Sequence, residues 1–237
     1  MTDAISIPFA AQMEVAERVA NAATRANRAD LGDRLRIAVA RTARPATIIC
    51  VVGEFKQGKS SLVNAMLGQH ICPVDDDLAT SVITLLRYGE EIAIEVRRRV
   101  NGELVVEQVA SDAIVDWVTE AGNPDNGKDV ERVDVALPSA LLKDGSCIVD
   151  TPGMGSMGAG HAAATLAFLP FADGLVFASD ASAELSEPEV DFLKRARQLC
   201  PNIVVVLTKI DLYPHWREIR ELNIGHLERI EIGRAHV

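Results

Sequence analysis

The sequence predicts an α/β fold with a mostly parallel central sheet flanked by helices, an inserted β-hairpin and helices before the sheet. Short, continuously apolar runs at residues 46–52 and 203–207 are typical of strands buried on both faces of a parallel sheet. The first run ends at a glycine-rich motif followed by helix-forming sequence, which is the order of a β–α unit. These two observations fix the fold class.

Residues 1–43 are predicted to form a separate N-terminal helical segment, because they are rich in Ala and Arg. A break is expected near Asp30, a candidate helix cap. Apolar residues at helical spacing form two candidate stripes, Met13, Val19, Ala20 and Ala23, then Leu31, Leu35 and Ala38. Such faces need partners, and two remain open: the domain that follows, or helices from elsewhere in a longer protein.

The first apolar run leads into a phosphate-binding loop. The sequence at residues 53–60 matches G-x-x-x-x-G-K-[ST], and residues 62–67 continue it as a helix. Backbone N–H groups at such a loop and helix start bind phosphate oxygens. Lys59 would bridge the outer phosphates, and the Ser60 hydroxyl would bind Mg²⁺. The loop residues expected to contact nucleotide are Gly53, Glu54, Phe55, Lys56, Gln57, Gly58, Lys59, Ser60 and Ser61.

A second motif, Asp-Thr-Pro-Gly at residues 150–153, follows an apolar strand at residues 147–149. The carboxyl ends of parallel strands meet at one edge of a sheet, so this motif is expected beside the phosphate-binding loop. Asp150 would hold a Mg²⁺-bound water, and the Gly153 amide would reach the terminal phosphate.

A third motif, Thr208-Lys209-Ile210-Asp211, follows residues 203–207. Asp211 can accept two hydrogen bonds from the ring N–H and amino group of guanine, which adenine cannot supply together. At about 1.5 to 3 kcal/mol per charge-assisted bond, the pair favours GTP over ATP by roughly two to four orders of magnitude. Lys209 is expected to pack its stem along the base and to steady the loop.

A GTPase also needs a threonine between the first two motifs, to sense the terminal phosphate and complete the metal shell. Thr80 is the best candidate, with Ser81 and Thr84 as alternatives. The predicted metal ligands are therefore Ser60, Thr80 and Asp150. The aperiodic, acidic segment before Thr80 suits a loop that orders on nucleotide binding, and its run of Asp at 75–77 is interpreted as solvated charge.

These motifs resemble the G domain of bacterial dynamin-like proteins, a P-loop NTPase fold. The resemblance covers roughly residues 44–215, is strongest around the phosphate-binding loop, and extends to mycobacterial members at residues 208–216. It implies a GTPase that binds GTP, GDP and Mg²⁺, self-associates through its G domains and remodels membrane lipid through a helical stalk that is not seen here. It also implies a cytoplasmic protein, peripheral at the inner face of the plasma membrane.

The catalytic apparatus departs from that of small signalling GTPases. These place a glutamine after the Asp-x-x-Gly motif to orient the attacking water, whereas this sequence has Met154. Lys56 and Gln57 are the nearest polar candidates, beside Lys59 and Thr80. Eukaryotic dynamins carry Gln-Ser where this chain has Phe-Lys, so their catalytic roles do not transfer directly. The resemblance implies that two facing G domains complete each other's sites.

Residues outside the motifs complete the fold. Alternating segments at 91–96 and 104–109 flank Asn101-Gly102, the strongest short hairpin pattern. Ser111 is expected to cap a short helix that contains Trp117. Further strands are predicted at residues 132–137 and 174–178, and a capping box at Ser186 should open a helix that continues to Leu199.

Composition limits the function classes. The chain of 237 residues is 48% hydrophobic and has a net charge of −10. The charge argues against nucleic-acid partners, because phosphate-backbone binding depends on clustered Lys and Arg. The four cysteines are widely spaced and are expected to be reduced, and neither a membrane span nor a signal peptide is apparent. A translation- or ribosome-associated GTPase and a non-hydrolysing nucleotide switch remain alternatives to the dynamin-like GTPase.

The last seven residues, 231–237, match one reading frame of a common sequencing-library adapter, in which the next codon is a stop. We therefore expect them to be an artefact, and residues 44–230 to be a G domain cut before its last strand and helix. The apolar strand at residues 203–207 would then form an exposed sheet edge.

Overall fold

The structure is a computed structural model that describes residues 9–26, 28–29, 31–32, 35, 46–74, 80–154, 165–166, 168–200 and 202–233. The chain divides into two compact units, Met1–Pro45 and Ala46–Val237. The predicted cap Asp30, the apolar Ala38, the acidic run at 75–77 and residues 234–237 lie outside the described residues.

The first unit contains α1 (Phe9–Arg25). Ala20 is fully buried and lies against Gly32, where an added Cβ would be 2.8 Å from the Ala20 carbonyl oxygen. Val19, expected on the same stripe, is instead 53% exposed, and Leu31 is 40% exposed. The stripe is therefore not one buried face, because adjacent positions 19 and 20 point to different sides of the helix.

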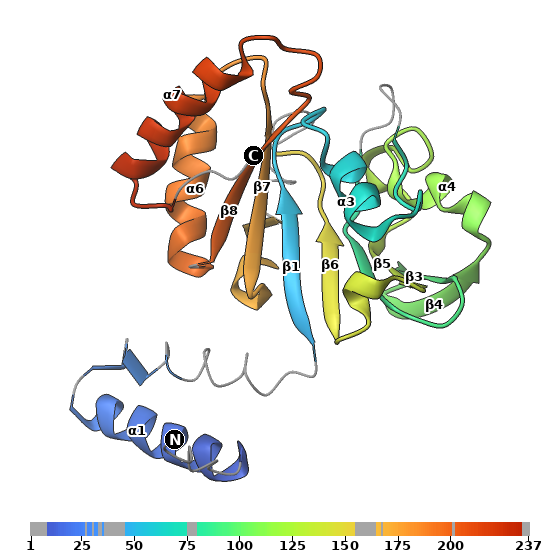
Figure 1. Ribbon diagram of the computed structural model, residues 1–237. Helices are drawn as coiled ribbons and strands as arrows, with labels where there is room; N and C mark the ends of the chain where they lie inside the picture. Colours follow the sequence, from blue (N-terminus) through green and yellow to red (C-terminus); the bar gives the residue numbers. More distant parts are fainter. Residues whose placement is uncertain are drawn as a thin grey trace, which may run out of the picture. The chain divides into compact units, whose positions relative to one another are not determined.

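The second unit is built on an eight-stranded mixed sheet in the order β4-β3-β5-β2-β6-β1-β7-β8 (Figure 1). The β6–β1–β7–β8 half and the β5–β2 pair are parallel, whereas β2–β6, β5–β3 and β3–β4 are antiparallel. The mostly parallel sheet with an inserted hairpin is thus confirmed. The strands are β1 (Thr47–Val52), β2 (Thr84–Tyr88), β3 (Ala93–Val100), β4 (Glu103–Val109), β5 (Val130–Leu137), β6 (Ser146–Asp150), β7 (Gly174–Asp180) and β8 (Ile203–Thr208).

Helices pack on both faces of this sheet. One core contains Val63 of α3 (Lys59–Leu67), Val118 of α4 (Val115–Val118) and Ile148 of β6. The other contains Phe177 of β7 and residues of α6 (Glu187–Leu199) and α7 (Trp216–Arg229). Figure 1 shows α6 and α7 beside β7 and β8, and α3 and α4 toward the other half of the sheet. Two layers of helix therefore bury the central strands and leave their carboxyl ends to form a site.

The outer strands agree with the sequence pattern. Asn101 and Gly102, at the β3–β4 turn, have φ values of 54° and 86°, as the tight turn requires. At the opposite edge β8 pairs only with β7 among the described residues, and Val204 is 39% exposed. Ile232 is buried in the second core with Leu227. The interpretation of residues 231–237 as an adapter artefact stays a prediction.

One predicted helix cap is wrong and another is confirmed. The helix-start position before the 3-10 turn Ser111–Ala113 is Ala110, and no side chain caps it. Ser111 lies inside the turn instead, because the turn begins at Ser111 and not at the residue after it. In contrast, Ser186 Oγ accepts from the Glu189 N–H at the start of α6, and the Glu189 carboxylate accepts from the Ser186 N–H at 2.8 Å.

Removing the confirmed cap should destabilise the domain measurably. Replacing Ser186 by alanine is expected to lower the free energy of unfolding by about 1 kcal/mol, the usual effect of losing a side-chain cap. Urea unfolding followed by circular dichroism measures the change. Ser111→Ala is the matched control and should unfold like the unmodified chain. Equal unfolding curves for all three proteins would contradict the role assigned to the capping box.

Candidate nucleotide-binding site

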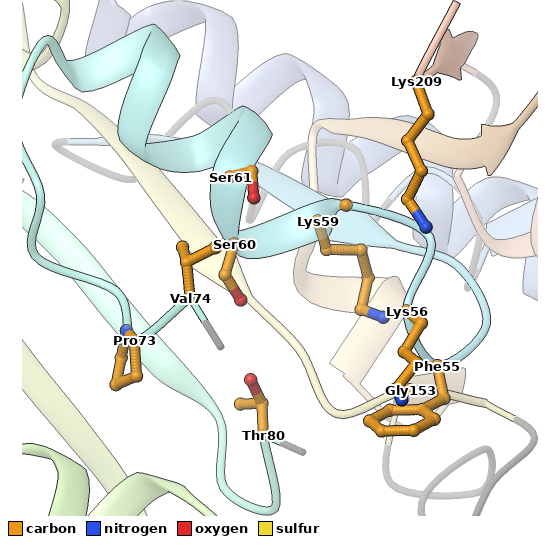
Figure 2. Close-up of a pocket in the computed structure, with 11 residues that line it drawn as sticks. Phe55, Lys56, Lys59, Ser60, Ser61, Pro73, Val74, Thr80, Gly153 and Lys209 are labelled. Carbon is orange, nitrogen blue, oxygen red and sulfur yellow. The ribbon is translucent and has the colours of Figure 1, made fainter. Parts of the chain in front are cut away.

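A cavity of about 400 Å³ opens at the carboxyl edge of the parallel strands (Figure 2). Its wall combines the phosphate-binding loop and the start of α3, the segment around residue 80, the Asp-Thr-Pro-Gly motif and the turn after β8. The lining residues are Phe55, Lys56, Gly58, Lys59, Ser60, Ser61, Pro73, Val74, Thr80, Gly153 and Lys209. Predicted site residues from four separate segments therefore meet at one cavity.

The loop between β1 and α3 is tightly wound. Lys56 and Gly58 have φ values of 63° and 77°, in the left-handed region, and α3 starts directly after Gly58. At Gly53, a Cβ would lie 2.2 Å from the Ala178 carbonyl oxygen of β7, so only glycine fits there. The first-turn N–H groups of α3 have no partner within the helix and are the donors that an anion would use.

Lys59 lies inside this loop and is only 6% exposed. Its Nζ donates to the Glu54 carbonyl oxygen at 2.6 Å, which closes the loop on itself. Burial lowers the pKa of Lys59, while the nearby carboxylates of Asp150 and Glu54 oppose that shift. The loop thus holds a desolvated cation at the cavity wall, where a phosphate group would be a strong counter-charge.

Three oxygen groups gather beside Lys59. Ser60 Oγ donates to Asp150 Oδ2 at 2.9 Å, and Figure 2 shows the Ser60 and Thr80 hydroxyls pointing toward one another. The other carboxylate oxygen, Asp150 Oδ1, is buried and has no hydrogen-bond partner among the described residues. Burial raises the pKa of Asp150, against the opposing effects of the Lys59 charge, the Ser60 hydroxyl, the Thr151 N–H and the Cys72 thiol. A buried carboxylate oxygen without a partner, next to two hydroxyls, fits a hard divalent cation such as Mg²⁺.

The structure distinguishes the candidate threonines. Thr80 lines the cavity and forms an isolated bridge with Thr119. Ser81 is bound instead to the Val118 carbonyl through both its N–H and its hydroxyl. Thr84 is 2% exposed within β2. Geometry therefore favours Thr80 over the two alternatives.

The turn after β8 is fastened to the phosphate-binding loop. Thr208 Oγ1 donates to the Gln57 carbonyl oxygen at 2.9 Å. Lys209 has a φ of 54°, lines the cavity and donates from Nζ to Asp180 Oδ2 at 3.2 Å. Asp211 is exposed and does not line the cavity.

The two candidates for orienting water are placed differently. Lys56 lines the cavity, with its Nζ 5.3 Å from the centre of the Phe55 ring. The side-chain oxygen of Gln57 accepts the Asp180 N–H and is thus engaged at the end of β7. Of the pair, Lys56 is the one in position to face a ligand.

The Asp-Thr-Pro-Gly motif contacts the same loop. A Cβ at Gly153 would lie 2.9 Å from the Phe55 backbone, and the Met154 N–H donates to the Gly53 carbonyl at 3.3 Å. The Met154 side chain packs against the second core. Among the predicted nucleotide contacts, those outside the cavity wall are Gly53, Glu54, Gln57, Thr208 and Asp211.

Known protein families and solved structures agree with this site and this fold. The sequence profile of the Dynamin family matches residues 49–210 of this chain. The chain belongs to the dynamin family. The matched residues therefore form a dynamin-type, GTP-binding G domain. Family membership does not favour the ribosome-associated GTPase or the non-hydrolysing switch that the sequence left open.

The curated relatives of this chain are much longer than the part that it matches. The isoniazid-induced protein IniA of Mycobacterium tuberculosis is 40% identical over 207 residues, which are 86% of this chain and 32% of IniA. A probable transmembrane GTPase, the chloroplastic FZO-like protein of Arabidopsis thaliana, is 33% identical over 184 residues, 78% of this chain and 17% of that protein. The chain thus spans about a third or less of the length of these relatives.

Solved structures support the fold. Two chains from work on an oligomerised bacterial dynamin pair, described as a mechanism for long-range sensing and tethering of membranes, superpose with TM-scores of 0.63 and 0.59. They cover 97% and 83% of this chain, and 37% and 31% of their own length, at 18% and 22% identity. At this identity the likeness supports the dynamin-type fold alone. Among the described residues, no helix is long and apolar enough to cross a bilayer.

Sequence reasoning missed one residue of the site. Asp180, the last residue of β7, is 9% exposed and contacts both Lys209 and Gln57. A polar residue at the end of an apolar strand, on the edge that carries the other motifs, was the available signal. It belongs to no named motif, and its contacts come from segments distant in the sequence.

Proposed function

We propose that this chain binds GTP with Mg²⁺ and hydrolyses it, and that in a longer protein this activity drives assembly and membrane remodelling. The observation that carries the proposal is the convergence of Lys59, Ser60, Asp150 and Thr80 beside one cavity, with the Thr-Lys-x-Asp turn tied to the same loop. Family membership supports a GTPase rather than an ATPase.

Ser60, Thr80 and Asp150 would hold the metal, with Asp150 acting through a bound water. Asp150 Oδ1, buried without a partner among the described residues, is the structural support for this assignment. Such a metal supplies positive charge that neutralises the phosphates.

The chain's own residues bind and orient the nucleotide. Lys59 would exchange its bond with the Glu54 carbonyl for bonds to the outer phosphates, and the Gly153 N–H would contact the terminal phosphate. Lys209 would lie along the base, and Asp211 would accept its ring N–H and amino hydrogens. These contacts position a triphosphate without covalent chemistry by the protein, as phosphoryl transfer requires.

Water orientation is the incomplete part of the site. Met154 has no group that can hold a water, and the Gln57 side chain is bound to the Asp180 N–H. Lys56 is the remaining candidate of the loop. We propose that a second G domain facing the nucleotide completes the arrangement. In a longer protein, other segments would contact lipid. That protein would act peripherally at the inner face of the plasma membrane.

Concentration-dependent turnover tests the proposal. Phosphate release from GTP should require Mg²⁺, stop with EDTA and be slow in dilute protein. The rate per molecule should rise as protein concentration is raised through the micromolar range, because two domains must meet. No release at any concentration would contradict hydrolysis. A Mg²⁺-dependent rate per molecule that stays constant would contradict only the facing-domain part.

A further inference from the structure

Asp180 is a buried carboxylate at the carboxyl end of β7, held by several donors. Its Oδ2 accepts from Lys209 Nζ at 3.2 Å. Its Oδ1 accepts from the Ser182 N–H at 3.0 Å and also from the Ser182 hydroxyl. Both carboxylate oxygens are therefore engaged, and the side chain is only 12% exposed.

The main chain of Asp180 makes a second connection. Its N–H donates to the side-chain oxygen of Gln57 in the phosphate-binding loop. Thr208, its register partner on β8, donates to the Gln57 carbonyl oxygen. Asp180 thus stands between the loop that holds phosphates and the turn that carries the base-recognising residues.

We propose that Asp180 is a positioning residue for guanine-nucleotide binding, whose carboxylate holds Lys209 in place at the cavity wall. This inference rests on the proposed function and adds a residue that none of the sequence motifs contains. Ser182 holds the Asp180 carboxylate in position, and this carboxylate in turn holds the Lys209 ammonium in position.

The physical reason is the freedom of a lysine side chain. A long side chain loses conformational entropy when a ligand orders it, which weakens binding. The Lys209 side chain is 32% exposed, so without a partner it could adopt many rotamers. The ion pair restricts these rotamers before the nucleotide arrives. Burial alone would raise the pKa of Asp180, but the hydrogen bonds from Ser182 and Lys209 lower it overall, so the group stays ionised at neutral pH.

The substitution Asp180→Asn separates this role from a purely structural one. Asparagine has nearly the same shape, leaves the main-chain bond to Gln57 intact and keeps an acceptor for the Ser182 N–H. It removes the charge that attracts Lys209. The dissociation constant for GDP, measured by calorimetry in Mg²⁺, should rise about tenfold, since the lost pair is a partly exposed charge-assisted bond.

A double-mutant cycle with Lys209→Met gives the decisive readout. If Asp180 acts through Lys209, Asp180→Asn should have less than about a twofold effect in the Lys209→Met background. Ser182→Ala, which loosens the carboxylate, should weaken GDP binding about threefold and remains informative if Asp180→Asn does not fold. Asp191→Asn is the matched control, an exposed aspartate paired with Lys194 at 2.8 Å on α6, and should bind GDP normally.

The outcomes are distinguishable. Normal GDP binding by folded Asp180→Asn would overturn this inference and leave the proposed function intact. An equal loss with and without the Lys209 ammonium would also overturn it, because Asp180 would then act independently of Lys209. If the unmodified, folded chain binds no guanine nucleotide, the proposed function fails and this inference fails with it.

Discussion

Replacing Lys59 by methionine is expected to weaken GDP and GTP binding by at least about a hundredfold. Methionine keeps the unbranched apolar stem but removes the ammonium that the loop holds at 6% exposure. Two charge-assisted contacts to phosphate, at about 1.5 to 3 kcal/mol each, account for a loss of this size. Calorimetric titration in Mg²⁺ measures it.

The control for this variant is Lys194→Met, which removes an exposed ammonium on α6. It should bind nucleotide like the unmodified chain. Thermal unfolding is measured alongside to establish that Lys59→Met is folded, because the substitution removes the positive charge beside the buried Asp150 carboxylate. Normal GDP affinity in folded Lys59→Met would exclude this loop as the phosphate site.

Replacing Asp211 by asparagine is expected to change which base is bound. Guanine presents two donors, its ring N–H and its amino group, to the carboxylate. Asparagine offers one acceptor and one donor, which matches the N–H and carbonyl of xanthine instead. GDP affinity should fall roughly a hundredfold, and xanthosine diphosphate should bind more tightly than it does to the unmodified chain. Competition titrations with both nucleotides measure the change.

Asp112→Asn is the matched control for this prediction, because it replaces an exposed aspartate in the turn that precedes α4. Its preference for guanine should be unchanged. Unchanged GDP affinity in folded Asp211→Asn would mean that residue 211 does not contact the base.

Much of the site could be predicted from sequence because its chemistry lies in short, continuous motifs. The three motifs each follow a buried strand, so their shared edge follows from the parallel topology. The choice of Thr80 over its neighbours needed the structure, since a hydroxyl's direction depends on the segments packed around it. Asp180 and the engaged Gln57 side chain were unpredictable for the same reason: their bonds join β7, β8 and the loop, which are far apart in sequence.

One strand and one long α-helix were among the elements not assigned from sequence. Strand β2 is short, and its alternation ends in exposed residues, so its pairing with β5 and β6 came only from the fold. Helix α7 begins at Trp216, and the residue before it, His215, makes no side-chain cap. Its buried face includes the polar Asn223, whose Oδ1 accepts the Leu185 N–H, and this interrupts the apolar periodicity that marks an amphipathic helix.

A single buried amide joins the phosphate-binding helix to the segment that leads toward Thr80. Asn64 of α3 accepts the Ile71 and Cys72 N–H groups and donates to the Cys72 carbonyl, at 2.7 to 3.0 Å. Because these hydrogen bonds are buried and reinforce one another, α3 and residues 71–72 form one rigid unit. The start of the phosphate-binding helix and residues 71–72 are therefore expected to move together when a nucleotide binds.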